Sequence, residues 1–428
     1  MKIQNISARE ILDSNGNPTI ETTVELLDGT TGTASVPSGA STGKTEVLEL
    51  RDEDMNRYGG KGVLKAVNIV NNTISPLFKD KEINSQEEFD NILIQADGTK
   101  NKEKFGGNTI LSCSEAFARA VANSFGLELF DYIAMTYWKD NNYRGKLTLP
   151  TPLVLVLEGA KHGNWSTDIQ EYMIVPNSLH FKTFSEKIEA SVKVYNQIGK
   201  ILSEKNYSLG VGFEGAYAPK ELKNNQEAFD IIVEGINKSN YKLGEHFNIA
   251  LDVASSEFYS HQSSTYNLKK ENRNLSPQEW NDFQMEWYKK YSVISVEDPF
   301  DQEAWDSWSK FTQEFGEKGM VVGDDLLTTN AERIEIGIER KAINTVLIKP
   351  NQIGTVTETL NAIKLTEEKG LNSIISHRSG ETNDSFIADL VVGTPSKFAK
   401  FGGVNRGERL SKYNRLLNIE SSLTRILT

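Results

Sequence analysis

Alternating apolar and polar residues at the start of the chain predict an antiparallel sheet. Residues 2–12 and 19–27 alternate as half-buried strands do, and Asp28-Gly29 is a turn signal that leads back into a third strand. From residue 62 to residue 138 the apolar positions recur every three or four residues, which predicts helices. The pattern therefore indicates a small α+β domain over residues 1–138.

A different rhythm begins at residue 139 and continues to residue 428. Short apolar runs, each typical of a buried parallel strand, end in a charged or ionisable residue and are followed by a helical pattern. The clearest run is residues 293–300, where four strand-forming residues lead to Glu297 and Pro299 stops the strand. Comparable runs end at Asp252, Asp324, Lys349 and His377.

The spacing of these strand ends favours a barrel. Glu297, Asp324, Lys349 and His377 are 27, 25 and 28 residues apart, which is about one strand, one helix and two short loops. A (β/α) barrel brings such strand ends to one rim, where barrel enzymes have their active sites. We therefore predict an α/β fold, with residues 139–428 as the barrel domain.

Two local expectations concern this second domain. Thr355 and Glu358 have the spacing of a capping box that opens a helix ending near Gly370. The polar stretch 260–274 is expected to be an exposed excursion between two barrel strands.

Composition and charge limit the classes of partner. The net charge of −12 argues against nucleic acid or an anionic membrane as the main partner, but it permits local anion sites. A single cysteine, Cys113, excludes an intramolecular disulfide and fits a reducing compartment. Because no apolar run is long enough for a membrane span or a signal core, we expect a cytoplasmic protein.

The strand ends suggest a metal beside a base. Asp252, Glu297 and Asp324 offer hard oxygen ligands without a cysteine or histidine trio, which favours Mg²⁺. Lys349 is a candidate base, because a nearby divalent cation makes its neutral form accessible. The alternative is that Lys349 only neutralises the acids.

Two further groups of residues offer polar chemistry. Arg378 and Ser379, with Lys400 on the last strand, are suited to hold a phosphate or carboxylate. Glu214 on a glycine-rich loop could act as the opposing acid, whereas a lone loop histidine such as His162 is more often structural.

Six motifs in the same order resemble those of the enolase family over essentially the whole chain. They are Ser38-Gly-Ala-Ser-Thr-Gly43, Leu251-Asp-Val-Ala-Ser-Ser-Glu257, Val296-Glu-Asp-Pro299, Gly323-Asp-Asp325, Lys349-Pro-Asn-Gln-Ile-Gly354 and Ser376-His-Arg-Ser-Gly-Glu381. The resemblance implies a modified (β/α)8 TIM barrel that begins with antiparallel strands, and an N-terminal α+β capping domain. It also implies reversible dehydration of 2-phospho-D-glycerate to phosphoenolpyruvate with two Mg²⁺ ions, in a homodimer or higher oligomer.

Roles carry over from the family by matching position. The resemblance implies Lys349 as the base that takes the C2 proton and Glu214 as the donor to the departing hydroxide. The remaining implied positions are Asp252, Glu297 and Asp324 as ligands of the first metal; Ser41 as a ligand of the second metal; Gln170, Arg378, Ser379 and Lys400 as substrate contacts; and His162, Glu171 and His377 as supporting polar residues.

Several positions depart from the family pattern. Phe213 and Ala216 flank the Glu214 segment where the family usually has aspartate and glycine, and Glu158 replaces an asparagine before the His162 loop. Asn15, Asn418 and Ser421 replace residues that are usually charged, which removes expected ion pairs between subunits.

Two alternatives to an active glycolytic enzyme remain at this point. One is a catalytically weakened paralogue that acts mainly as a binding protein, for example at the cell surface. The other is a different dehydratase or racemase of the superfamily acting on a sugar acid, although such relatives usually carry their lysine base earlier in the barrel and lack the Ser41-type loop.

Overall fold

The computed structural model describes residues 1–39, 43–140 and 142–427. Its N-terminal part contains the predicted antiparallel sheet, ordered β1 (Ile3–Leu12), β2 (Pro18–Leu26) and β3 (Thr31–Ser35). The turn between β2 and β3 forms as expected, with Gly29 at a φ of +84° and the Thr30 amide donating to Asp28 Oδ1 at 2.8 Å.

Helices cover one side of this sheet. They are α1 (Leu64–Ile69), α2 (Ser75–Phe78), α3 (Gln86–Asp97), α4 (Gly107–Ser124) and α5 (Leu129–Trp138). Helix α4 lies against β3 so closely that a Cβ on Gly32 would approach the Ala120 nitrogen to 2.1 Å, so glycine is required there. The ring of Phe89 lies between Phe78 and Phe117, with ring centroids 4.4 Å and 4.2 Å away.

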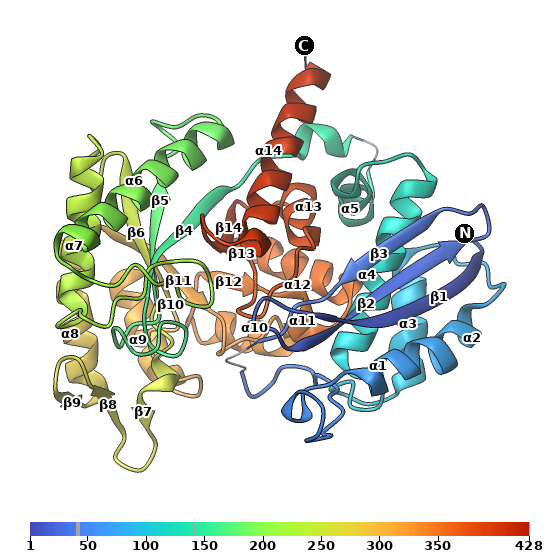
Figure 1. The fold of residues 1–428 in the computed structure, drawn as a ribbon, viewed down its shortest axis with the longest axis horizontal. Coiled ribbons are helices and arrows are strands. Elements are labelled where there is room, and N and C mark those ends of the chain that lie inside the picture. The colour runs from blue at the N-terminus through green and yellow to red at the C-terminus, as the bar shows by residue number, and fades with distance from the viewer. Residues whose placement is uncertain (40–42, 141, 428) are drawn as a thin grey trace.

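The second part is a closed barrel of eight strands, as the sequence predicted (Figure 1). Around the barrel the order is β10-β11-β12-β13-β14-β4-β5-β6. Strand β5 pairs antiparallel with both β4 and β6, whereas the other neighbouring pairs are parallel. The strands are β4 (Thr151–Glu158), β5 (Glu171–Pro176), β6 (Phe247–Asp252), β10 (Val293–Glu297), β11 (Met320–Gly323), β12 (Thr345–Ile348), β13 (Asn372–Ser376) and β14 (Phe398–Gly403).

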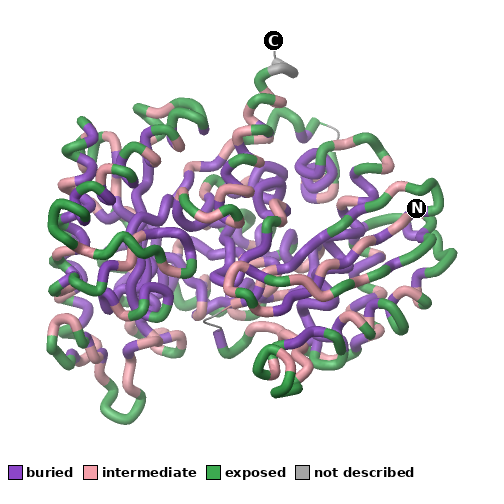
Figure 2. The backbone as a smooth tube through the Cα atoms, in the orientation of Figure 1, coloured by how far each residue is buried: buried purple, intermediate pink, exposed green. Residues whose placement is uncertain are grey.

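Helices surround the barrel strands, which are buried in the middle of the domain (Figure 2). The helices are α6 (Phe184–Glu204), α7 (Asn225–Lys238), α8 (Pro277–Lys290), α9 (Trp305–Phe315), α10 (Ala331–Glu339), α11 (Pro350–Ile353), α12 (Val356–Glu368), α13 (Phe386–Gly393) and α14 (Gly407–Leu427). A strand that is buried on both faces needs apolar residues at successive positions, which is why these strands appear in the sequence as continuous apolar runs.

Of the two local expectations, one is confirmed and one needs correction. Residues 260–274 are exposed or half-buried except at Tyr266 and Leu268, and they also contribute to a small sheet of β7 (Tyr259–Ser260), β8 (Thr265–Leu268) and β9 (Arg273–Leu275). Tyr266 in β8 is buried, with its ring centroid 5.8 Å from that of Trp280. At α12, Thr355 accepts from the Glu358 amide at 3.0 Å, but Glu358 accepts from the Thr355 hydroxyl and from Lys102 rather than closing a capping box.

The N-terminal domain contacts the barrel on the side where the parallel strands end. Ser38 and Gly380 exchange backbone hydrogen bonds of 2.8 Å and 2.9 Å, and Arg119 forms an ion pair with Asp384. Because Gly380 follows β13, the first domain lies over the rim where the charged strand ends were expected.

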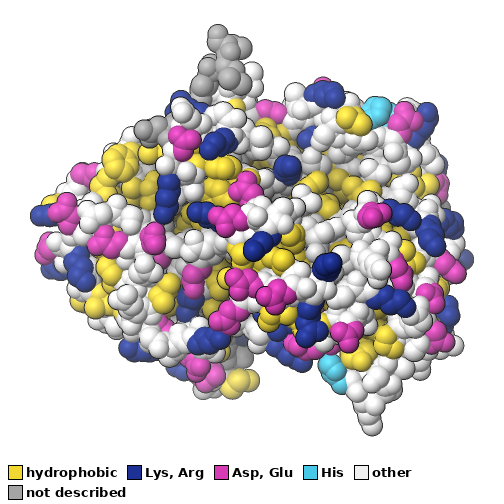
Figure 3. All heavy atoms as spheres, turned by 180° about the vertical axis from the view of Figure 1, so that it is seen from behind, with side chains coloured by type: hydrophobic (Ala, Val, Ile, Leu, Met, Phe, Trp, Pro, Cys, Tyr) yellow, Lys and Arg dark blue, Asp and Glu magenta, His cyan; other side chains and the backbone are white. Residues whose placement is uncertain are grey.

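Two properties of the molecule bear on its partners. Within the described part of the chain, no helix has the length and apolar composition that a bilayer crossing requires. On the face shown in Figure 3, acidic and basic side chains are interspersed rather than gathered by sign.

Candidate active site

Four carboxylates form one row across four adjacent barrel strands. Glu158 of β4 pairs in register with Glu171 of β5, Glu171 with Asp252 of β6, and Asp252 with Glu297 of β10. We call these four residues the carboxylate row. All four are buried, with exposed fractions between 1% and 4%, so their mutual repulsion needs a nearby positive charge.

Lys400 supplies that charge. Its Nζ lies 3.3 Å from Glu171, 3.2 Å from Asp252 and 2.8 Å from Glu297. Burial alone would lower the pKa of Lys400, but the carboxylates, Asp252 foremost, outweigh burial and raise it well above its usual value. Lys400 is therefore a buried ammonium shared by three members of the row.

Lys349 and Asp324 form a second charged pair beside the row. Lys349 Nζ donates to Asp324 Oδ2, and Gln352 Nε2 donates to Asp324 Oδ1 at 2.8 Å. Burial opposes the charge on Lys349, yet Asp324 outweighs burial and raises the pKa of the amine. In this arrangement Lys349 is an ammonium held by a predicted metal ligand.

Asp298 and Asp325 add two further acids next to Asp324. Oxygen atoms of these three aspartates lie within 4.8 Å of one another. Asp298 accepts from the backbone amides of Asp324 and Asp325 at 3.0 Å and 2.9 Å, so it fixes the loop after β11. Burial, then the charge of Asp324, raise the pKa of Asp325 to about 8.

Glu214 lies between two histidines. Its Oε1 is 3.4 Å from His162 Nδ1 and its Oε2 is 3.3 Å from His377 Nε2. Glu214 and His162 are both buried, although the sequence placed each of them on a loop. Burial would raise the pKa of Glu214, but His377 and His162 outweigh burial and lower it well below its usual value.

The two histidines differ in protonation. Burial lowers the pKa of His377 to about 3, and Arg409 Nη1 donates to its Nδ1 at 2.6 Å, so the neutral ring carries its proton on Nε2 facing Glu214. Burial also disfavours charge on His162, but Glu214 and Glu171 outweigh burial and raise its pKa to about 9. His162 therefore carries a proton 3.4 Å from Glu214.

Glu158, the fourth member of the row, is held by backbone amides. The amide of Glu214 lies 3.1 Å from both of its carboxylate oxygens, and the amide of Ala216 donates to Oε1 at 2.7 Å. A Cβ on Gly212 would come within 2.3 Å of Glu158 Oε2, so the segment folds tightly around this side chain. Burial and the charge of Glu214 raise the pKa of Glu158 to about 8.

The anion-binding candidates converge on the same place. Arg378 is 3% exposed, and its guanidinium donates to Glu46 at 2.9 Å and 3.2 Å and to Asn351 at 3.0 Å. Gln170 Nε2 donates to Asp252 at 3.2 Å, while no hydrogen bond reaches its Oε1 from the described residues. Both side chains are thus oriented before a ligand arrives.

A small cavity of about 20 Å³ joins these groups. Its lining consists of His162, Gln170, Glu171, Glu214, Asp252, Asp324, Lys349, Ser376, His377, Arg378, Ser379 and Lys400. Every residue we predicted for the site is in this lining except Glu297, whose carboxylate contacts Lys400, and Ser41, which lies outside the described residues.

Sequence reasoning missed several residues of the site. Glu46 orients Arg378, and Arg409 orients His377. Asp298 orients the loop that carries Asp324. Arg409 is 0% exposed, although a charged residue in a helix is usually exposed. Glu46 follows the small-residue loop, and Asp298 adjoins Glu297, so proximity to two predicted motifs was the only available signal.

The donor types suit a hard divalent cation, although the oxygens of Asp252, Glu297 and Asp324 are not among the described groups whose ligand atoms all lie within 4.8 Å of one another. Asp252, Glu297 and Asp324 line or adjoin the cavity with oxygen donors, and the unpartnered Gln170 Oε1 lies beside Asp252. Burial, then the charge of Asp252, raise the pKa of Glu297 well above its usual value, although Lys400 opposes the rise. A bound divalent cation would favour the charged carboxylates in the same way as Lys400.

Fold and site together define a closed barrel with a lysine and a glutamate in the lining of one buried cavity. Comparison with protein families then identifies the lineage. The family described as "Enolase, C-terminal TIM barrel domain" matches residues 146–427, and "Enolase, N-terminal domain" matches residues 3–133. The chain belongs to the enolase family, which supports its assignment as a lyase of the enolase type.

Proposed function

We propose that the protein catalyses the reversible dehydration of 2-phospho-D-glycerate to phosphoenolpyruvate, as a phosphopyruvate hydratase of glycolysis. The observation that supports this most directly is that Lys349 and Glu214 line one small cavity together with Arg378, Ser379 and Lys400. A base, an opposing acid and a set of anion-binding groups are what removal of water from a phosphorylated hydroxy acid requires.

Binding of the substrate falls to the preoriented polar side chains. We assign the phosphate to Arg378 and Ser379, because a guanidinium fork matches phosphate oxygens and Arg378 is already fixed by Glu46 and Asn351. Gln170 and Lys400 would contact the substrate carboxylate. The buried position of all four residues excludes water from these contacts.

Lys349 would take the proton from C2. To do so its amine must be neutral, so Asp324 must give up the ammonium that it holds in this structure. Asp252, Glu297 and Asp324 would hold one Mg²⁺, and Ser41 would help to hold a second. When bound, the two ions would supply positive charge that stabilises the negative charge developing on the substrate carboxylate. The carbanion electrons then form the C2–C3 double bond as the C3–O bond breaks.

Glu214 would deliver the proton that lets hydroxide leave as water. Its own pKa is lowered, so the proton must come from a neighbour, and protonated His162 lies 3.4 Å away. Glu171, whose pKa is raised to about 7 by burial and by Glu214, adjoins both groups. His377 fixes the other oxygen of Glu214 through its Nε2.

Absorbance of phosphoenolpyruvate tests this function. Purified protein with Mg²⁺ and 2-phosphoglycerate is expected to produce the absorbance, and Lys349→Ala should reduce turnover by a factor of about 100 to 10,000. Wild-type turnover no greater than that of Lys349→Ala would refute the proposal and leave the binding protein and the enzyme acting on a sugar acid as alternatives. We further propose that the protein is cytoplasmic and forms a homo-oligomer built from dimers. Light scattering can test the oligomeric state.

A further inference from the structure

A histidine pair lies at the end of the barrel opposite the active site. Pro176 ends β5 in register with Phe247 at the start of β6, whereas Glu171 and Asp252 pair at the catalytic end of the same two strands. His180 follows β5 and His246 precedes β6. Of the five histidines in the sequence, these two therefore lie together but away from the cavity.

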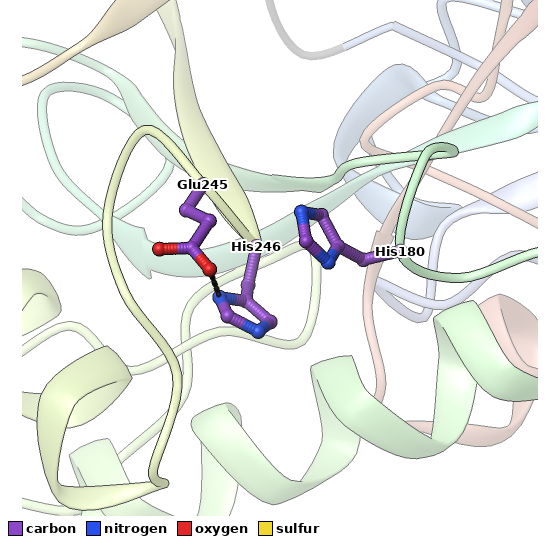
Figure 4. Close-up of side chains that lie close together, drawn as sticks. All are labelled: His180, Glu245 and His246. Carbon is purple, nitrogen blue, oxygen red and sulfur yellow. Dashed lines mark ion pairs between the residues drawn. The ribbon is translucent and has the colours of Figure 1, made fainter.

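The two rings and a glutamate face one another (Figure 4). The ring centroids of His180 and His246 are 4.6 Å apart, and Glu245 Oε1 is 3.8 Å from His246 Nδ1. One potential ligand atom from each of the three side chains lies within 4.8 Å of the others. His246 Nδ1 forms no hydrogen bond within the described residues, so it is available as a ligand.

Asn177 holds the two loops together. Its backbone amide donates to the His246 carbonyl at 2.8 Å, and its side-chain amide donates to the Glu245 carbonyl at 2.8 Å. Its own carbonyl accepts from the His180 amide at 3.0 Å. The backbones that carry the three side chains are thus fixed relative to one another by a single residue.

We propose that His180, Glu245 and His246 form a Zn²⁺ site that links the β5–α6 loop to the segment before β6. Two imidazole nitrogens and one carboxylate oxygen suit Zn²⁺, with water in the fourth position. Ligand atoms around tetrahedral Zn²⁺ are about 3.3 Å apart, compared with up to 4.8 Å here. Because the rings stack at 28° and a Zn–N bond lies in the imidazole plane, one ring must also rotate for both to bind the ion. His180 and Glu245 are exposed and can make that adjustment.

Lys242 offers a second test of the proposal, because its charge disfavours binding of a cation at this cluster. Its Nζ lies 3.1 Å from Glu245 Oε2, the oxygen that does not face His246. Because an ammonium repels a divalent cation, removing this charge should strengthen the site.

Zn²⁺ titration in the presence of excess Mg²⁺ tests the proposal, with a chromophoric chelator reporting free metal. Wild-type protein should bind one more equivalent of Zn²⁺ than His180→Gln or His246→Gln, or bind it at least about tenfold more tightly. Lys242→Met should tighten binding. His261→Gln is the matched control, because His261 contacts Tyr259 and Asp301 instead.

The active site is unchanged in all these variants and can bind metal equally in each. Only a difference in Zn²⁺ binding between the variants therefore reports on this cluster. A rise of the melting temperature with Zn²⁺ in the wild type and in His261→Gln, but not in His180→Gln, supports the site. If His246→Gln does not fold, His180→Gln and Glu245→Gln carry the test. Equal stoichiometry and affinity in the wild type and the cluster variants, or equal loss in His261→Gln, overturns it.

Discussion

Replacing Glu158 by glutamine tests whether the carboxylate row keeps a proton at neutral pH. In the folded protein, burial and Glu214 raise the pKa of Glu158 to about 8 from a usual value of 4.5. The unfolded chain therefore loses this proton at a lower pH than the folded chain does. The folded state is favoured by the retained proton at low pH, and this contribution falls as the pH rises from about 4.5 through 8.

The magnitude follows from the two pKa values. Over the window between them, each pH unit changes the free energy of unfolding by about 1.4 kcal/mol. Between pH 6 and pH 8 the wild type should lose about 2 kcal/mol through Glu158, because the folded group begins to ionise at the top of the window. Glutamine does not titrate, so Glu158→Gln lacks this loss.

Urea unfolding of both proteins at pH 6, 7 and 8 measures the effect. At pH 6 the two proteins should have similar stability, since the neutral wild-type carboxyl and the glutamine amide each offer one carbonyl that can accept from the Glu214 and Ala216 amides. The stability difference should then move by about 2 kcal/mol in favour of the variant by pH 8. A difference that stays constant across this range would refute the protonation assigned to Glu158.

The remaining predictions concern the thiol, the core and the anion site. Cys113 is 0% exposed, and burial raises its pKa to about 12, so a disulfide reagent should label it only after unfolding in urea; rapid labelling of native protein would contradict its burial. Trp308→Ala should cost about 3–5 kcal/mol in the free energy of unfolding, because the ring is fully buried, whereas Phe125→Ala at a 61% exposed position should cost less than about 0.5 kcal/mol. Arg378→Lys cannot reproduce the two-nitrogen contact with Glu46, so KM for 2-phosphoglycerate should rise about tenfold or more; an unchanged KM would exclude Arg378 from the phosphate site.

The barrel could be predicted because its strands follow a local rule. An apolar run that ends in a charged residue at Glu297, Asp324 and Lys349 shows both where each strand ends and which residues share a rim. The observed strands β10, β11 and β12 end at or just before these residues. The N-terminal meander was predictable for the same reason, since its alternation and its turn at Gly29 are encoded within a few residues.

The contacts that hold the site residues could not be predicted in the same way. Arg409 reaches His377 across 32 positions of sequence, and Glu46 reaches Arg378 across 332. No periodicity links residues so far apart, and a buried arginine in an amphipathic helix looks like any polar helix position. The environment of Glu214 could not be predicted for a similar reason. Nothing in its glycine-rich segment indicates that residues distant in sequence bury the side chain.

The reversed strand β5 explains why Glu171 belongs to the carboxylate row. Glu171 is the first residue of β5, and in a parallel strand the first residue would lie at the end away from the active site. Because β5 runs antiparallel to β4 and β6, Glu171 instead lies in register with Glu158 and Asp252. That position brings Glu171 within reach of both Lys400 and His162, at 3.3 Å and 3.6 Å. The reversal therefore places one carboxylate between the ammonium of Lys400 and the ring of His162, which a barrel with all strands parallel could not do with the same residues.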